Sequence, residues 1–119
     1  MSYDISIYRI ETKLKEQQYK GDDFFDNTEN FVPFTKEQKQ YFRENLEAMD
    51  YEFHQENEYG SVFWHKEYGE ALLSDKALYF STSFNEDCIF EVGLFASELA
   101  MEDEFAKYDP QNTGWEEIE

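Results

Sequence analysis

The sequence predicts a single α+β domain over residues 1–119, with an antiparallel β-sheet, a meander of about five strands, and two to three helices packed on one face. A chain of 119 residues is long enough for one ordinary hydrophobic core. Short apolar and polar alternations between turn residues indicate strands, and apolar residues at helical spacing indicate helices. Aromatic residues make up 19% of the chain, which is typical of a folded protein and not of an acidic disordered one.

The first third of the chain predicts a strand, a short helix and a long loop. Residues 3–8, YDISIY, alternate apolar and polar side chains as in a strand with one face on a core. Residues 11–20, ETKLKEQQYK, are rich in helix-forming residues, and Leu14 is the apolar anchor expected for a short helix. Residues 22–34, DDFFDNTENFVPF, mix turn residues with phenylalanines that we expect to hold a functional loop to the domain.

A helix and a meander are predicted for the middle of the chain. Thr35 and Gln38 have the spacing of a capping box, and apolar residues at helical spacing follow it, so a helix is expected over residues 36–49. From Tyr51 onward, four short extended runs alternate with turn signals, as in an antiparallel meander. Apolar residues at every second position of 88–94 predict a further strand, and Ser97 is expected to begin a short helix ending near Lys107.

The charge of the chain is strongly negative and unevenly distributed. The chain has ten Lys and Arg and 28 Asp and Glu, which gives a net charge of −18. It would therefore repel a bare nucleic acid or an anionic membrane and attract a basic protein. Residues 44–65 contain six acidic residues and no Lys or Arg. Residues 85–119 contain eleven acidic residues and one lysine, a local net charge of −10, which places the strongest negative field in the C-terminal third.

No catalytic, metal or cofactor signature is evident in the sequence, so a non-enzymatic protein is expected. Asp109 opens a register that resembles a calcium loop, but position 12 of that loop would fall one residue beyond the end of the sequence. His54 and His65 lie in predicted strands with no nucleophile motif beside them. Cys88 is expected in the core, and a single cysteine without a signal-peptide pattern predicts a cytoplasmic protein.

The C-terminal acidic strip is the predicted surface for a partner. The predicted partner-binding residues are Glu98, Glu102, Asp103 and Glu104 for electrostatic steering, with Tyr108, Asp109, Trp115, Glu116 and Glu117 at the contact. The alternatives are a solvated face that keeps the protein soluble, and a Trp115 that only holds the tail to the core.

Four segments, MSYDISIYRI, FVPFTKEQKQYF, ALLSDKALYFS and EFAKYDPQNTGWEE, together resemble a group of small acidic bacterial proteins similar to the immunity proteins of polymorphic toxin and contact-dependent inhibition systems. This resemblance implies a cytoplasmic, stoichiometric inhibitor that blocks one basic toxin or nuclease domain, and it assigns no binding residues. Two alternatives stay open: a nucleic-acid-mimicking protein that binds DNA- or RNA-binding proteins, and a small non-catalytic ligand-binding domain. A surface this rich in aromatic residues is also compatible with a homo-oligomer.

Overall fold

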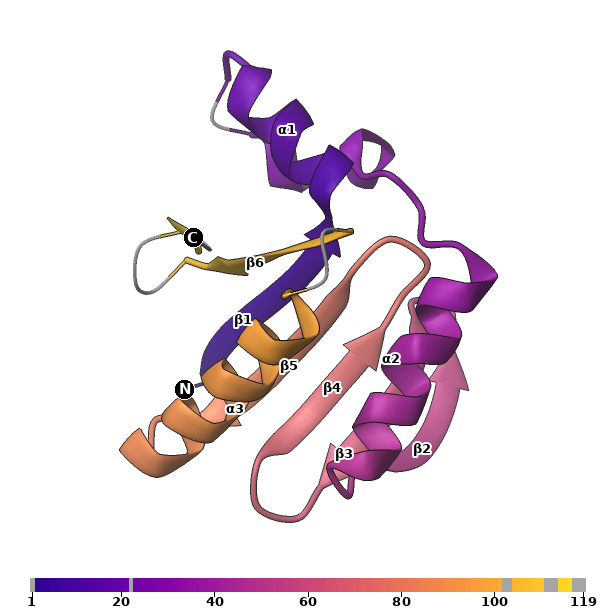
Figure 1. The fold of residues 1–119 in the computed structure, drawn as a ribbon, viewed down its shortest axis with the longest axis vertical. Coiled ribbons are helices and arrows are strands. Elements are labelled where there is room, and N and C mark those ends of the chain that lie inside the picture. Colours follow the sequence, from indigo (N-terminus) through magenta and orange to yellow (C-terminus); the bar gives the residue numbers. More distant parts are fainter. Residues whose placement is uncertain (1, 22, 102–103, 111–113, 117–119) are drawn as a thin grey trace.

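A seven-stranded antiparallel sheet forms the centre of the computed structural model, which describes residues 2–21, 23–101, 104–110 and 114–116 (Figure 1). The strands are β1 (Ser2–Arg9), β2 (Glu52–Asn57), β3 (Gly60–His65), β4 (Gly69–Leu73), β5 (Leu78–Ser83), β6 (Phe105–Asp109) and β7 (Gly114–Trp115). Their order across the sheet is β2-β3-β4-β5-β1-β6-β7. The α+β class, the first strand and the meander β2–β5 are confirmed, and two further strands pair beyond β1.

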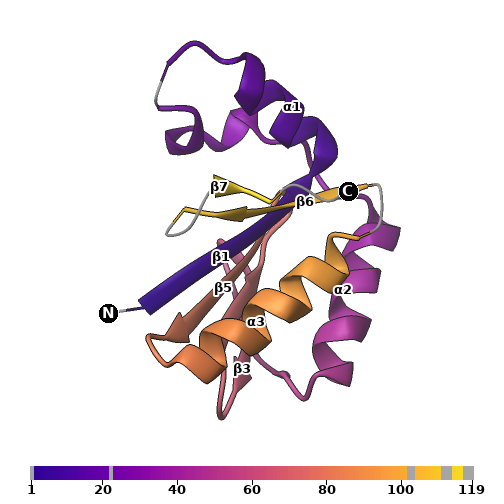
Figure 2. The ribbon, with the colours of Figure 1, turned by 60° about the vertical axis from the view of Figure 1, so that its left-hand side comes forward.

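Helices cover both faces of this sheet. They are α1 (Ile10–Gln18), α2 (Lys36–Ala48) and α3 (Glu86–Leu99), with two short 3-10 turns, η1 (Phe24–Asp26) and η2 (Thr28–Asn30). Figure 2 shows α2 and α3 on one side of the strands and α1 on the other. The two longer helices thus share one face, as expected, whereas the segment from α1 to η2 covers part of the opposite face.

The main core lies between the sheet and the pair α2 and α3. The predicted capping box is present, since Thr35 accepts a hydrogen bond from the N–H of Gln38 and the Gln38 side chain accepts one from the N–H of Thr35. The helix that follows directs Phe42 and Leu46 inward, and both side chains are fully buried. They pack against the alternate residues of the strands that point to this face, including Ile5 and Ile7. The helix predicted over residues 36–49 is confirmed.

A second, smaller core lies on the opposite face. Tyr8, Phe24 and Phe31 are buried there with Ala77, and Phe25 packs against them. The phenylalanines of residues 22–34 therefore do hold that segment to the sheet, as the sequence indicated. Aromatic rings of this size each remove a large apolar area from water, which explains how a segment with only short 3-10 turns is fixed in place.

The anchor expected for the first helix is wrong. Leu14 is 50% exposed, and the buried side chain of α1 is Thr12. The Thr12 hydroxyl accepts a hydrogen bond of 2.8 Å from the N–H of Val32. A polar contact to the loop, which apolar periodicity does not report, therefore orients this helix.

The strand predicted for residues 88–94 and the helix predicted from Ser97 to Lys107 are both wrong. One helix, α3, runs through Glu86–Leu99, and its N-cap Asn85 accepts hydrogen bonds from the N–H groups of the first turn. The chain then enters β6, which pairs with β1. The buried residues of α3 follow helical spacing: Cys88, Val92, Phe95, Ala96 and Leu99. Cys88 is in the core, as predicted, but on a helix.

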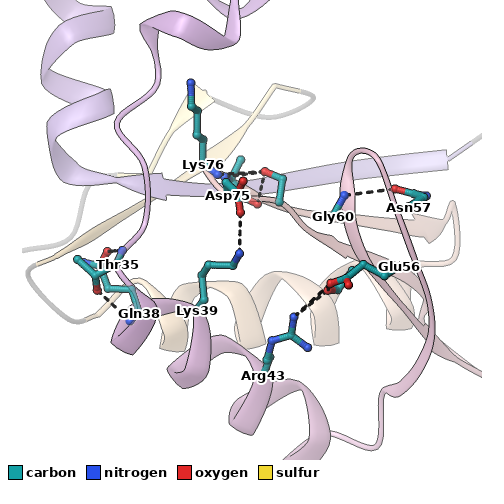
Figure 3. Close-up of polar contacts among 12 residues, drawn as sticks. Thr35, Gln38, Lys39, Arg43, Glu56, Asn57, Gly60, Asp75 and Lys76 are labelled. Carbon is teal, nitrogen blue, oxygen red and sulfur yellow. Dashed lines mark hydrogen bonds and ion pairs between the residues drawn. The ribbon is translucent and has the colours of Figure 1, made fainter.

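The hairpins of the meander depend on two glycines with positive φ. Gly60, at φ +144°, begins β3, and a side chain there would meet the carbonyl oxygen of Leu73. The Asn57 side chain accepts hydrogen bonds from the N–H groups of Tyr59 and Gly60, and Figure 3 shows the second of these. Gly69, at φ +98°, opens β4 after the next turn. The turn signals in the sequence thus lie where the structure turns.

Candidate partner-binding surface

The aromatic residues of the predicted C-terminal strip pack against the body of the molecule. The Trp115 ring lies 4.9 Å from that of Tyr108 and 5.7 Å from that of Tyr8, measured between centroids. Its indole N–H donates a hydrogen bond of 2.8 Å to the Glu16 carboxylate of α1. Both Tyr108 and Trp115 pack against the second core and are only partly buried. Trp115 therefore ties β7 to α1 and the second core, as the alternative given above for its role expects.

Two carboxylates of that strip have partners within the chain. Asp109 is 8% exposed and accepts a hydrogen bond of 2.8 Å from the Tyr3 hydroxyl. Burial, together with this bond and the charge of Asp109, raises the pKa of Tyr3 to about 12. Glu116 accepts a hydrogen bond of 2.9 Å from Ser97 and lies 3.5 Å from the Lys107 ammonium. Neither group is presented to solvent as a bare charge.

The other residues of the strip are divided among separate places. Glu98 is exposed on α3, and Glu104 is exposed just before β6, where it accepts a hydrogen bond from the Gln38 amide. Glu102, Asp103 and Glu117 lie outside the described residues, as do Gln111 and Thr113, positions 3 and 5 of the calcium-like register that begins at Asp109. The structure thus brings Tyr108 and Trp115 together, and it leaves Glu98 as the predicted steering residue on an open helix face.

An open groove of about 1180 Å³ lies at one end of the sheet, and we call it the aromatic groove. Part of the lining comes from residues 48–50, where α2 ends. The rest comes from Glu52 of β2, from residues 64–70, which are the end of β3, the turn after it and the start of β4, and from Ser81 of β5. Glu52, Trp64, Glu70 and Ser81 are neighbours across adjacent strands. The groove is therefore built mainly from the ends of helices and strands and the short turns beside them.

The aromatic side chains of the groove are oriented by stacking. Trp64 is 51% exposed, and the His54 ring stacks on it with centroids 3.4 Å apart and planes 14° apart. His65 stacks on Tyr68 at 4.2 Å and 16°. The Nδ1 atom of His65 accepts hydrogen bonds from the N–H groups of Glu67 and Tyr68, so this imidazole holds the turn in shape. His54 covers one face of the indole, and the exposed remainder faces solvent.

Negative charge dominates the lining of the groove. The lining contains four acidic residues, Asp50, Glu52, Glu67 and Glu70, and one basic residue, Lys66. Within the described part of the chain, none of these four carboxylates forms an ion pair. Such a surface attracts cations, and an exposed indole provides a face on which a cation can lie.

Basic residues of the neighbouring helix are directed elsewhere. Lys39 donates to Asp75 at 2.6 Å, and Arg43 lies 3.8 Å from Glu56 (Figure 3). Lys39 holds the pKa of Asp75 below its usual value, mainly through this hydrogen bond. These cations of α2 are therefore engaged with other carboxylates than those of the groove.

One sequence feature did indicate the groove, but the prediction of a binding surface relied on the more acidic C-terminal third instead. Asp50 and Glu52 belong to the acidic stretch 44–65, which has no Lys or Arg and ends in Trp64 and His65. Glu67 lies in the turn between β3 and β4, and Glu70 pairs with Trp64 across that hairpin.

Comparison of the chain with protein-family models, with curated proteins and with solved structures finds no match. None of the helices within the described ranges has the length and apolar content needed to cross a membrane. Three or more His, Cys, Asp or Glu side chains do not converge on a common metal position anywhere in the described part.

Proposed function

We propose that this protein is a stoichiometric inhibitor that binds a basic protein, and specifically a cytoplasmic immunity protein that neutralises a cognate basic toxin or nuclease by covering its active site. The observation that carries this proposal is the aromatic groove, whose lining includes a half-exposed Trp64 and four carboxylates, none of which forms an ion pair with another described residue. Acidic surfaces of this kind speed association with basic partners and select among them.

The groove suits a cationic side chain of the partner. A guanidinium over an indole contributes about 0.5–1 kcal/mol at an exposed site and about 2 kcal/mol when it is desolvated. The Trp64 ring is already held by His54, so little side-chain freedom is lost when a partner docks. Glu52 and Glu70 are the residues opposite Trp64 in the two flanking strands, and they place carboxylates beside the indole.

The whole molecule reinforces this local attraction. At a net charge of −18, the acidic side chains repel one another in the folded state, and the protein attracts a basic protein at long range. Association should therefore be fast at low salt and should slow steeply as salt is added, because exposed charges are screened over about 8 Å at physiological ionic strength. The resemblance to immunity proteins supports the same class of partner.

The test begins with the gene beside this one. If it encodes a toxin domain, that domain should bind this protein in a one-to-one complex and lose its toxic activity. Trp64→Ala should weaken the complex by about 30-fold or more, as for an interface hot spot. Tyr59→Ala is the matched control, since Tyr59 is 66% exposed at the other end of the β2–β3 hairpin, and it should change affinity by less than about threefold.

Two results would overturn the proposal. One is a neighbouring gene with no toxin domain together with no basic protein retained by the purified chain. The other is comparable binding to several unrelated DNA-binding proteins, which would favour a nucleic-acid mimic, because an inhibitor of one toxin discriminates among partners.

A further inference from the structure

The outer face of α3 carries apolar side chains that no described element covers. Phe90 is 65% exposed and Leu94 is 46% exposed, one helical turn apart, and Met101, just beyond the helix, is 68% exposed. We call these three residues the α3 stripe. Spacings of four and seven residues place them along one side of the helix axis. Contiguous exposed apolar residues of this kind mark interaction sites more often than single ones do.

The fold does not require the α3 stripe. The opposite side of the helix already supplies the core contacts, since Val92, Phe95 and Leu99 are buried against the sheet and α2. A surface helix ordinarily has polar residues on its outer side, and a helix that is apolar on both sides is normally buried on both. On the described surface, α3 is therefore a helix with one side packed and one side open.

Acidic residues flank the α3 stripe. Asp87, Glu91 and Glu98 follow one another along the helix at spacings of four and seven residues, and α3 contains no Lys or Arg. On the other flank, Lys107 is 8% exposed and donates to the carbonyl oxygen of Gly93 and to Ser97. The outer face of α3 is thus apolar along its centre, with a row of three acidic residues beside it.

The first turn of α3 lies beside the aromatic groove. The Cys88 thiol, in the first turns of α3, donates to the carbonyl oxygen of Glu67 at 3.5 Å, and Glu67 lines the groove. Partial burial first, and then the charges of Glu67 and Glu91, raise the pKa of the Tyr68 phenol, so Glu91 acts on a groove residue as well. A partner that occupies the groove is therefore close to α3.

We propose that the α3 stripe is a second docking surface, which binds an amphipathic basic helix of the same partner. Apolar side chains of that helix pack on Phe90 and Leu94, while its Lys and Arg side chains face Asp87, Glu91 and Glu98. This inference rests on the proposed inhibitor function. Charge complementarity selects a basic helix over a second copy of this chain, because a second copy would bring another net charge of −18 and another α3 without Lys or Arg to the contact.

The probe for this surface is an amphipathic peptide of about 18 residues, roughly five helical turns, with Leu at helical spacing and Lys on the other side. Titration calorimetry should detect binding to the intact protein. A peptide of equal charge with Ser in place of Leu should bind at least about tenfold more weakly, because it lacks the apolar contacts.

Phe90→Ser combined with Leu94→Ser should reduce binding of the Leu–Lys peptide by about tenfold or more. Both side chains are largely exposed, so the folded state should persist, and circular dichroism checks this. Leu14→Ser is the matched control, since Leu14 is 50% exposed on α1, on the opposite side of the sheet, and it should leave the affinity within about twofold. Glu91→Gln with Glu98→Gln should lessen the salt dependence of binding.

Three outcomes would overturn the inference. The first two are that the Leu–Lys peptide binds the Phe90→Ser/Leu94→Ser variant as tightly as the unchanged protein, or that the Ser–Lys peptide binds as tightly as the Leu–Lys peptide. The third is a dimer in sedimentation that the double variant dissociates, because a second copy would then occupy the stripe. These tests need no natural partner. A failed stripe therefore leaves the result of Trp64→Ala at the groove unaffected, and the two proposals fail separately.

Discussion

Replacing Trp115 tests whether the C-terminal strip supports the fold or contacts a partner. The indole lies 6.1 Å from the Phe25 ring, closer still to Tyr8 and Tyr108, and donates to Glu16. Truncating a fully buried tryptophan to alanine costs about 3–5 kcal/mol of unfolding free energy. Because Trp115 is only partly buried, Trp115→Ala should cost about 2–3 kcal/mol. Trp115→Phe keeps most ring contacts and loses one hydrogen bond, so about 1 kcal/mol is expected.

Urea unfolding followed by circular dichroism measures these differences. Trp64→Ala is the reference, because its side chain is half exposed, and it should cost no more than about 1 kcal/mol. If Trp115→Ala unfolds within about 0.5 kcal/mol of the unchanged protein, the internal packing argued for Trp115 is refuted. If the same variant loses partner binding while its stability is intact, the contact predicted for the C-terminal strip is correct.

Three further predictions concern pH and backbone. Burial and a carboxylate neighbour raise the pKa of Tyr3 to about 12, so the neutral phenol stabilises the folded state fully below about pH 10, and this contribution is lost as the pH rises through 12. Tyr3→Phe should remove this alkaline pH dependence and cost about 1 kcal/mol at neutral pH. Urea unfolding across the alkaline range measures both effects. Because the pKa of Asp75 is lowered in the folded state, its ionised carboxylate stabilises the fold at pH values above the ordinary aspartate pKa, and this contribution is lost as the pH falls through the lowered pKa. Lys39→Met should return the pKa of Asp75 toward 3.8, which carboxyl-carbon NMR can follow. An unchanged titration of Asp75 in this variant would contradict the pairing. Gly60→Ala should cost about 2 kcal/mol or more in thermal unfolding, because a side chain there would clash with the carbonyl oxygen of Leu73. Gly93→Ala, whose nearest atom would be 3.7 Å away, should be neutral or stabilising.

Local patterns and turn signals predicted β1, the meander β2–β5 and α2. Of these, β4, β5 and α2 alternate between core and solvent, whereas β1 is buried on both faces over residues 5–8 and β2 is exposed along its whole length. The turn and capping residues mark the ends of these elements. Contacts between distant residues had no local signal. The bond from Tyr3 to Asp109 joins residues 106 positions apart, and that from Trp115 to Glu16 joins residues 99 apart. The functional roles predicted for the C-terminal strip depended on these unseen contacts.

The misassigned segment 88–94 leads back to the α3 stripe. Two of the four apolar residues that suggested a strand, Cys88 and Val92, are buried one helical turn apart, and the other two are the exposed Phe90 and Leu94. Had polar residues stood at those two positions, only the helical pattern would have remained, and it would have agreed with the N-cap at Asn85. Sequences usually follow the local pattern of their secondary structure, and departures from that pattern occur most often at functional sites. The same two residues therefore explain the failed strand prediction and support the proposal that the outer face of α3 binds a partner.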